Sequence, residues 1–173
     1  SQAHTLLQQA LAKHPALVDA WYDLGIVEFE QGNLPAAVEA YQTCLSHSPN
    51  QAEVHYNLGN AQYALGQRAK AQAAWLAAVR LRPTLALAHY NLGLVAQELG
   101  EPDAAVDHYA TALQFEPDHQ DAALNQGDAL REARRLEEAI EVQTGFLKRH
   151  PGHPSGLNNL VATLTQARRY EKA

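Results

Sequence analysis

Five prolines recur at intervals of thirty-four residues, and other residues recur in step with them. They are Pro15, Pro49, Pro83, Pro117 and Pro151. A fixed period of this length is typical of a chain built from one repeated unit, which buries its apolar face only by stacking on its neighbours. The period therefore predicts a solenoid, and solenoids mostly bind other molecules.

The proline frame divides the chain into four full units and an incomplete unit at each end. The full units are residues 18–51, 52–85, 86–119 and 120–153. Residues 1–17 align with the second helix of a preceding unit, and residues 154–173 begin a further one. Because both ends cut through a unit and the chain contains no methionine, we expect a segment of a longer protein.

Each unit is predicted to be a hairpin of two helices, because apolar residues recur at helical spacing in both of its halves. Gly32, Gly66 and Gly100 lie between the halves, where a left-handed residue closes a helix. The periodic proline ends the second helix, and the residue after it is expected to cap the next helix. These predicted caps are Asn50, Thr84 and Asp118.

Small residues in the first helix predict close packing within each hairpin. Glycine recurs at the eighth position of each unit, as Gly25, Gly59, Gly93 and Gly127. We expect these glycines to face a recurring alanine of the second helix, namely Ala37, Ala71, Ala105 and Ala139. Larger side chains at either position would force the two backbones apart.

The repeated residues resemble the tetratricopeptide repeat, which pairs an aromatic residue, Leu-Gly and a second aromatic in one helix with Ala, an aromatic, Ala and Pro in the other. Trp21-Tyr22-Asp23-Leu24-Gly25 with Ala37, Tyr41 and Pro49 matches this pattern closely, and the next two units do so as well. The resemblance implies an all-α fold, a right-handed α-α superhelix of antiparallel hairpins whose first helices line the concave face.

The fourth unit departs from this pattern. Gln143 stands where the second helix should carry an aromatic residue, and Arg134 stands where the turn should carry glycine. Gly145 adds a cost of about 1 kcal/mol relative to alanine in the middle of a helix. We expect this unit to be the least stable.

The resemblance also implies which residues line the concave face, because the first helices expose one stripe of positions there. The predicted peptide-binding residues are Tyr22, Asp23, Phe29, Glu53, Tyr56, Asn57, Asn60, Tyr63, Tyr90, Asn91, Leu94, Asn125, Asp128 and Asn159. Asparagine recurs at the sixth position, and each amide carries both a donor and an acceptor for the peptide groups of an extended segment. Similar asparagine ladders are a feature of superhelices attached to O-GlcNAc transferases. The alternative is that these asparagines only assist helix packing.

Acidic residues predominate on the same stripe, where Arg131 is the single cation. These carboxylates include Asp19, Glu30, Glu53, Glu98, Asp121, Asp128 and Glu132. Such a face is expected to attract a neutral or basic segment. Members of the family that clamp a C-terminal carboxylate use lysines and an arginine there, so that function is not expected.

Other classes of site find little support in the sequence. A formal net charge of −6 disfavours nucleic acid, and no apolar run is long enough to insert into a membrane. Cys44 is the only cysteine and aligns with small buried alanines, while His55 and His89 take the place of Trp21 as packed rings. We expect no cofactor, no metal and no catalytic constellation in this segment. A cytoplasmic location is expected, with the periplasm or another soluble compartment left open.

The sequence therefore predicts a non-catalytic scaffold that binds an extended protein segment. Two alternatives remain open. In the first, the chain would be a substrate-recruiting arm of a larger enzyme such as a glycosyltransferase. In the second, it would be a structural solenoid whose ends stack into homo-oligomers.

Overall fold

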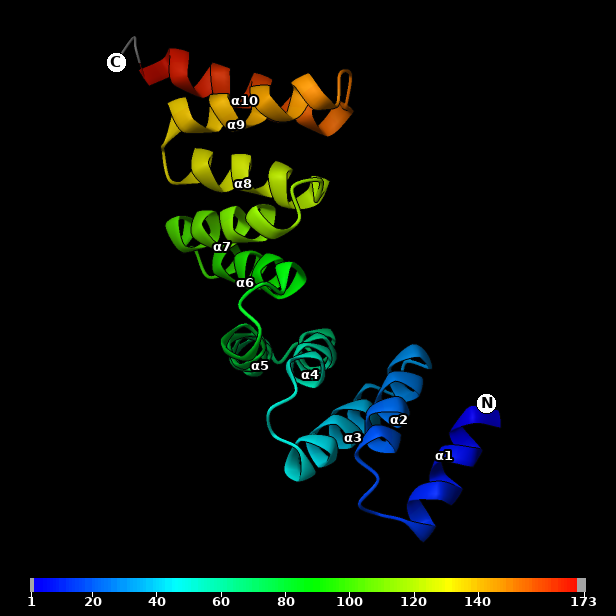
Figure 1. The fold of residues 1–173 in the computed structure, drawn as a ribbon. Helices are drawn as coiled ribbons and strands as arrows, with labels where there is room; N and C mark the ends of the chain where they lie inside the picture. The colour runs from blue at the N-terminus through cyan, green and yellow to red at the C-terminus, as the bar shows by residue number, and fades with distance from the viewer. Residues whose placement is uncertain (1, 171–173) are drawn as a thin grey trace. The chain divides into compact units, whose positions relative to one another are not determined.

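The computed structural model describes residues 2–170, apart from the side chain of residue 170, and over this range it contains ten α-helices and no strand. In chain order (Figure 1) they are α1 (Gln2–Lys13), α2 (Val18–Glu30), α3 (Leu34–His47), α4 (Ala52–Ala64), α5 (Arg68–Leu81), α6 (Ala86–Glu98), α7 (Pro102–Phe115), α8 (Gln120–Glu132), α9 (Leu136–Arg149) and α10 (Pro154–Tyr170). The predicted all-α repeat solenoid is confirmed. Residues 1 and 171–173, at the predicted outer boundaries, lie outside the described residues.

The helices form two compact units, Ser1–Pro83 (unit 1) and Thr84–Ala173 (unit 2). In each unit every helix packs on the next one along the chain. In unit 1, α2 also contacts α4, and in unit 2, α8 also contacts α10. These additional contacts bring together the first helices of consecutive repeats, which carry the predicted binding residues.

The turn inside each hairpin has the geometry that its glycine predicts. Gly32, Gly66 and Gly100 have φ values of 78°, 73° and 75°. In the first turn, the Gly32 N–H donates to the Phe29 carbonyl at 3.0 Å, and the Asn33 N–H donates to the Glu28 carbonyl at 2.9 Å. These two bonds define a Schellman motif, which satisfies carbonyls that the end of a helix leaves open.

The fourth hairpin makes the same turn without glycine. Arg134 adopts φ of 61°, and it is the only non-glycine residue with positive φ among those described. Its N–H donates to the Arg131 carbonyl at 3.2 Å, and the Arg135 N–H donates to the Leu130 carbonyl at 2.9 Å. The repeat frame therefore imposes the left-handed conformation on a residue that adopts it only at a cost.

The predicted helix caps are wrong by one residue. The N-cap positions are Gln51, Leu85 and His119 instead of Asn50, Thr84 and Asp118. Gln51 and Leu85 make no side-chain cap bond, whereas Nδ1 of His119 accepts from the Ala122 N–H at 3.3 Å. The loop uses one more residue after the proline before the chain enters the helix.

A different contact holds the loop at the periodic proline. Nε1 of Trp21 donates to the Pro15 carbonyl at 2.8 Å, and Nε2 of His55 lies 2.9 Å from the Pro49 carbonyl oxygen. The fourth repeat has alanine at this ring position. There Arg149, at the end of the second helix α9, donates to the Pro117 carbonyl oxygen at 3.1 Å. In the first two repeats, the ring at the fourth position thus fixes the preceding loop.

The glycines of the first helices make room for the aromatic residue of the second helix, rather than for its alanine as the sequence suggested. A Cβ on Gly25 would lie 2.4 Å from Cε1 of Tyr41, and a Cβ on Gly59 would lie 2.5 Å from Nε1 of Trp75. The buried Ala37 belongs to the same core cluster as Tyr41, and Ala105 belongs to the same cluster as Tyr109. Close backbone approach therefore depends on glycine opposite a large ring.

In the fourth repeat, residues 120–153, Gln143 occupies the space that an aromatic ring fills in the other repeats. This side chain is 2% exposed, and neither atom of its amide group has a hydrogen-bond partner within the described residues. Phe146 is also buried and packs its ring against those of His150 and His153, at 4.7 and 5.2 Å between centroids. The prediction that this unit is the least stable remains to be tested.

Candidate peptide-binding face

The predicted binding residues lie on the first helix of each hairpin, on α2, α4, α6, α8 and α10. Residues on α2 and α4 belong to unit 1 and those on α6, α8 and α10 to unit 2. We use the name ladder face for the fourteen residues of both units. Asp23, Phe29 and Glu53 are exposed, and the other eleven are half-buried. Each residue of the set therefore keeps some contact with solvent, as a binding surface requires.

Two of the ladder asparagines donate a hydrogen bond to a tyrosine of the preceding repeat. Nδ2 of Asn57 lies 3.1 Å from the hydroxyl oxygen of Tyr22 in unit 1. Nδ2 of Asn125 lies 3.4 Å from the hydroxyl oxygen of Tyr90 in unit 2. Both pairs are separated by thirty-five residues, one more than the period, because they join the sixth position of one repeat to the fifth position of the previous one.

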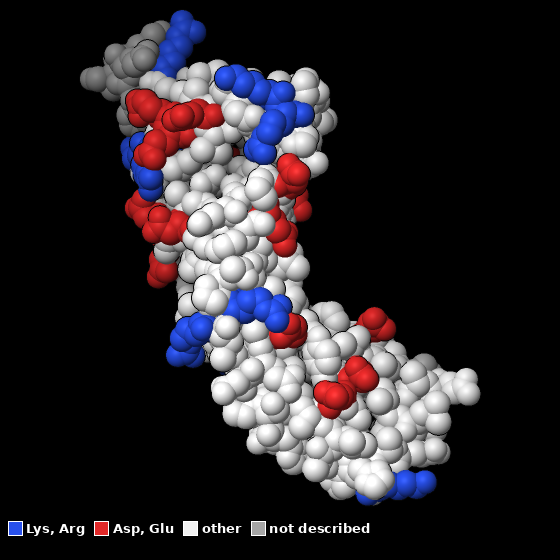
Figure 2. All heavy atoms as spheres, in the orientation of Figure 1, with Lys and Arg blue, Asp and Glu red and all other residues white. Residues whose placement is uncertain are grey.

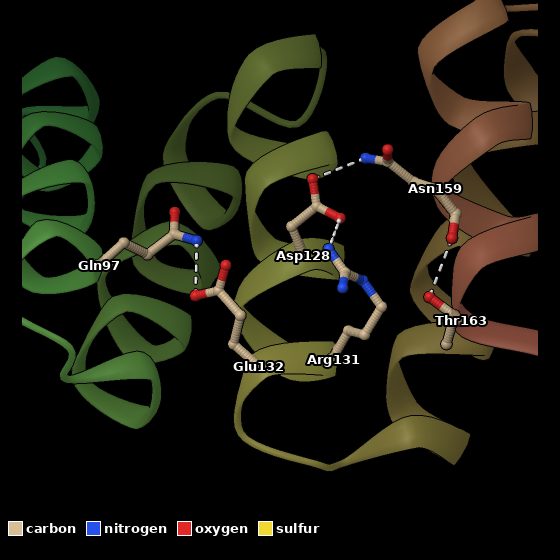
Figure 3. A network of polar contacts seen from close by, with 6 residues as sticks. All are labelled: Gln97, Asp128, Arg131, Glu132, Asn159 and Thr163. Atoms are coloured by element: carbon tan, nitrogen blue, oxygen red, sulfur yellow. Dashed lines mark hydrogen bonds and ion pairs between the residues drawn. The ribbon is translucent and has the colours of Figure 1, made fainter. Parts of the chain in front are cut away.

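The last pair keeps the asparagine but changes its acceptor. Asn159 follows a repeat with Leu124 at the tyrosine position, and its Nδ2 donates instead to Oδ2 of Asp128 at 2.8 Å (Figure 3). The other carboxylate oxygen of Asp128 lies 3.2 Å from the Arg131 guanidinium. An acidic residue one turn further along α8 thus replaces the missing hydroxyl.

The tyrosines of the ladder face rest on the rings buried beneath them. Tyr22 packs against Tyr41 at 6.2 Å between ring centroids, and Tyr90 packs against Tyr109 at 5.9 Å. Such tilted contacts add stability beyond burial of the ring area. The buried rings therefore hold the hydroxyl groups of the face in fixed positions.

Trp75 is the buried ring that supports the ladder residues of α4. Its ring lies 5.6 Å from that of Tyr63, and its Nε1 donates to Oδ1 of Asn60 at 3.1 Å and to the Tyr56 carbonyl at 3.2 Å. The amide oxygen of Asn60 is therefore engaged with the core. Asn60 contributes to the rigidity of the face more than to its free polar groups.

Family models match most of the chain. A model described as TPR repeat matches residues 27–66 and 63–100, and a model described as tetratricopeptide repeat matches residues 90–154. The chain belongs to the tetratricopeptide-repeat (TPR) family. TPR repeats form protein–protein interaction scaffolds and are generally non-catalytic, so the chain is a protein-binding scaffold.

Solved structures resemble most of this chain. MamA is 26% identical with a TM-score of 0.78, covering 84% of this chain and 79% of that one. YrrB, described as a TPR protein with an unusual peptide-binding site, is 20% identical with a TM-score of 0.85, covering 96% and 86%. PilF of Pseudomonas aeruginosa is 23% identical with a TM-score of 0.76, covering 98% and 83%. None of the curated protein sequences compared with the chain matches it.

Arginine side chains neutralise part of the negative charge on the predicted concave stripe. Glu53 pairs with Arg82, and Asp128 pairs with Arg131. The pKa of Glu53 is lowered, first by a hydrogen bond from its own backbone N–H and then by Arg82. Sequence reasoning missed Arg82 because it follows the last residue of α5, where the helical pattern no longer fixes its direction.

The hydroxyl groups of Tyr22 and Tyr90 have raised pKa values and stay protonated. Burial raises the pKa of Tyr22, and the Asn57 bond offsets part of that rise. Burial also raises the pKa of Tyr90, and the nearby Asp121 carboxylate adds to it. Because each oxygen accepts from an asparagine, its own O–H proton is left to donate elsewhere.

A chain of polar contacts in unit 2 was not predicted from the sequence. The Tyr109 hydroxyl donates to Oε1 of Gln97 at 2.7 Å, and Nε2 of Gln97 donates to Oε2 of Glu132 at 3.2 Å (Figure 3). Gln97 takes the position that Phe29 and Tyr63 hold in unit 1. The twelfth position of the repeat is therefore aromatic in unit 1, as Phe29 and Tyr63, and is Gln97 in the first repeat of unit 2.

No group of three or more His, Cys, Asp or Glu side chains within residues 2–170 is placed to hold a metal ion. Cys44 is buried, and burial raises the pKa of its thiol. None of the described helices combines the length and the apolar character needed to cross a membrane.

Proposed function

We propose that this TPR scaffold binds an extended, neutral-to-basic segment of a partner protein along the ladder face. The fourteen residues of that face are the proposed contacts. The arrangement resembles the asparagine ladder of O-GlcNAc-transferase-type arrays in its sequence pattern. Its particular feature is that the asparagines are paired with tyrosines.

The observation that carries the proposal is the hydrogen bond between Asn57 and Tyr22, repeated between Asn125 and Tyr90. An amide has two N–H donors and one carbonyl, and only one N–H is used here. Each pair can then offer a hydroxyl donor and an amide acceptor side by side. A peptide group presents the complementary acceptor and donor, so one pair recognises backbone without regard to side chain.

The charge of the face favours a neutral or basic segment over an acidic one. Asp19, Glu30 and Asp121 are exposed on the stripe. Arg82 pairs with Glu53, and Arg131 pairs with Asp128. Partial neutralisation lowers the expected attraction and its salt dependence without changing their sign.

A peptide array probed with the purified chain tests the proposal. The native protein is compared with the double variant Asn57→Ala with Asn91→Ala. The matched control is Gln42→Ala with Gln114→Ala, which removes two exposed amides from second helices. We expect the ladder variant to lose signal on peptides that the native and control proteins both bind. Equal binding by all three proteins would remove the ladder from the mechanism.

The comparisons do not favour the two alternative functions. The matched models describe TPR repeats and no glycosyltransferase, and the similarity to solved structures is one of fold. We therefore propose neither a recruiting arm of an enzyme nor end-to-end homo-oligomers as the role of this chain.

A further inference from the structure

A second groove lies in unit 1, on the side of α4 that faces away from the ladder. One hollow of about 280 Å³ lies between α4 and α5 and is lined by His55, Leu58 and Gln62 from α4. An adjoining hollow of about 260 Å³ shares His55 and Ala77 with it and extends to the loop after α3. We call the two together the α4–α5 groove.

The position of the groove follows from helix geometry. Successive residues of an α-helix are rotated by about 100°, so Leu58 and Gln62 point away from Asn57 and Asn60 on the same helix. The opposite wall is formed by alanines of α5, including Ala73 and Ala77. Alanine leaves room for another backbone to approach closely.

Gln62 has an unsatisfied acceptor at this groove. Its side chain is 5% exposed, and its Oε1 has no hydrogen-bond partner within the described residues. A buried polar atom without a partner is costly, and native proteins usually supply one. Gln62 therefore requires a donor, and the groove that it lines is the place from which a donor can come.

Two cations lie along the same face of α5. Lys70 lines one hollow and Arg80 the other, and both are exposed. With Ala73 and Ala77 they follow a spacing of three, four and three residues, which places them in one row about 15 Å long. Neither cation pairs with a carboxylate in the part of the chain that the structure describes. Figure 2 shows several Lys and Arg side chains in the region of α5, with an acidic side chain beside them.

The corresponding positions of the neighbouring repeats lack this combination. The first repeat has Glu28 in place of Gln62, and its carboxylate is already bonded to His4 at 2.7 Å and to Asn33 at 2.8 Å. The hollow that Glu28 lines in the first repeat is also lined by Glu39. The third repeat has Ala96 in place of Gln62 and Asp107 on the second helix. Among these three repeats, an open acceptor beside unpaired cations occurs only at the α4–α5 groove.

We propose that the α4–α5 groove binds an extended acidic segment of a partner protein. A backbone N–H of that segment donates to Oε1 of Gln62, and two of its carboxylates pair with Lys70 and Arg80. The segment is extended because the interior N–H groups of a helix are already bonded to their own carbonyls. The distance of about 15 Å between the cations corresponds to four or five residues of extended chain. The charge preference is opposite to that of the ladder face, so the two surfaces bind different partners.

The test uses the full chain labelled with ¹⁵N and a blocked octapeptide of alternating Glu and Thr as the probe, at low salt. We expect saturable chemical-shift changes at the amides of Ala73 and Ala77. Lys70→Glu with Arg80→Glu is expected to weaken binding about tenfold or more, because two attractions become two repulsions. The matched control, Lys13→Glu with Lys148→Glu, makes the same change in net charge at exposed sites outside the groove and should stay within about twofold of the native affinity.

A second variant separates binding from folding. Gln62→Leu removes the unsatisfied acceptor, so it should leave stability unchanged or raise it while weakening the octapeptide about threefold to tenfold. The proposal is overturned if the control pair weakens binding as much as the groove pair, or if Gln62→Leu binds as tightly as the native chain. It is also overturned if an octapeptide of alternating Lys and Thr binds the groove more tightly than the acidic one.

Discussion

Replacing Gln143 by methionine should stabilise the fourth hairpin. The amide of Gln143 is buried, and both of its polar atoms lack partners within the described residues. An unsatisfied buried polar group lowers the free energy of unfolding by about 1–3 kcal/mol. Removing two such groups is therefore expected to raise that free energy by at least about 2 kcal/mol. Methionine has nearly the same length and shape, so the exchange opens no cavity beside Gly127.

Hydrogen exchange is the appropriate assay, because in a repeat array stability is a sum of local terms. A gain of about 2 kcal/mol corresponds to exchange about thirtyfold slower for the protected amides of α8 and α9. Gln126→Met on the half-buried side of α8 is the matched control and should change these rates little. If Gln143→Met exchanges no more slowly than the native chain, the amide already has a partner such as a buried water and the reasoning is wrong.

Three further predictions concern single residues. Arg134→Gly should raise the free energy of unfolding by about 0.5–1 kcal/mol, measured by denaturant titration, because φ is 61° there; a loss of stability would contradict this. Gly59→Ala should lower the free energy of unfolding by about 1–3 kcal/mol, because its Cβ would lie 2.5 Å from the buried Trp75 ring. Gly145→Ala meets open space and should raise the free energy of unfolding by about 1 kcal/mol. Equal effects of the two changes would refute the packing argument. The pKa of His108 is lowered, first by burial and then by a neighbouring histidine ring. The unfolded chain therefore takes up this proton first as the pH falls, so stability should be full above about pH 6.5 and decline below it, and less steeply in His108→Gln; identical pH profiles would rule this out.

The repeat frame could be predicted from the sequence because it rests on local chemistry. A left-handed turn residue and a helix-ending proline act within a few residues of themselves, and Gly32 adopts the expected φ. The caps were misplaced for the same local reason. Asn50 is a good capping residue, but the loop geometry gives the cap position to Gln51.

Contacts between repeats were harder to foresee. The sequence placed Asn57 and Tyr22 on one stripe, and the spacing of one period plus one residue was visible in it. Which atoms would meet depends on how α2 and α4 cross, and a single sequence does not give that angle. The pairing of Glu53 with Arg82 depends in the same way on the loop after α5.

Two features were visible only once the chain was folded. The missing partners of Gln62 and Gln143 arise from the three-dimensional surroundings of each side chain. Glutamine in a helix is otherwise unremarkable in a sequence, because it is usually exposed to water.

The most direct test of the central claim is an NMR titration of the ¹⁵N-labelled chain with the peptide that gives the strongest signal on the array. We expect the side-chain amide resonances of Asn57 and Asn125 to shift saturably, and Tyr22→Phe to weaken binding while leaving the fold intact. Saturable binding that leaves both amide resonances unmoved and is unaffected by Tyr22→Phe would contradict the claim that tyrosine–asparagine pairs recognise the peptide backbone.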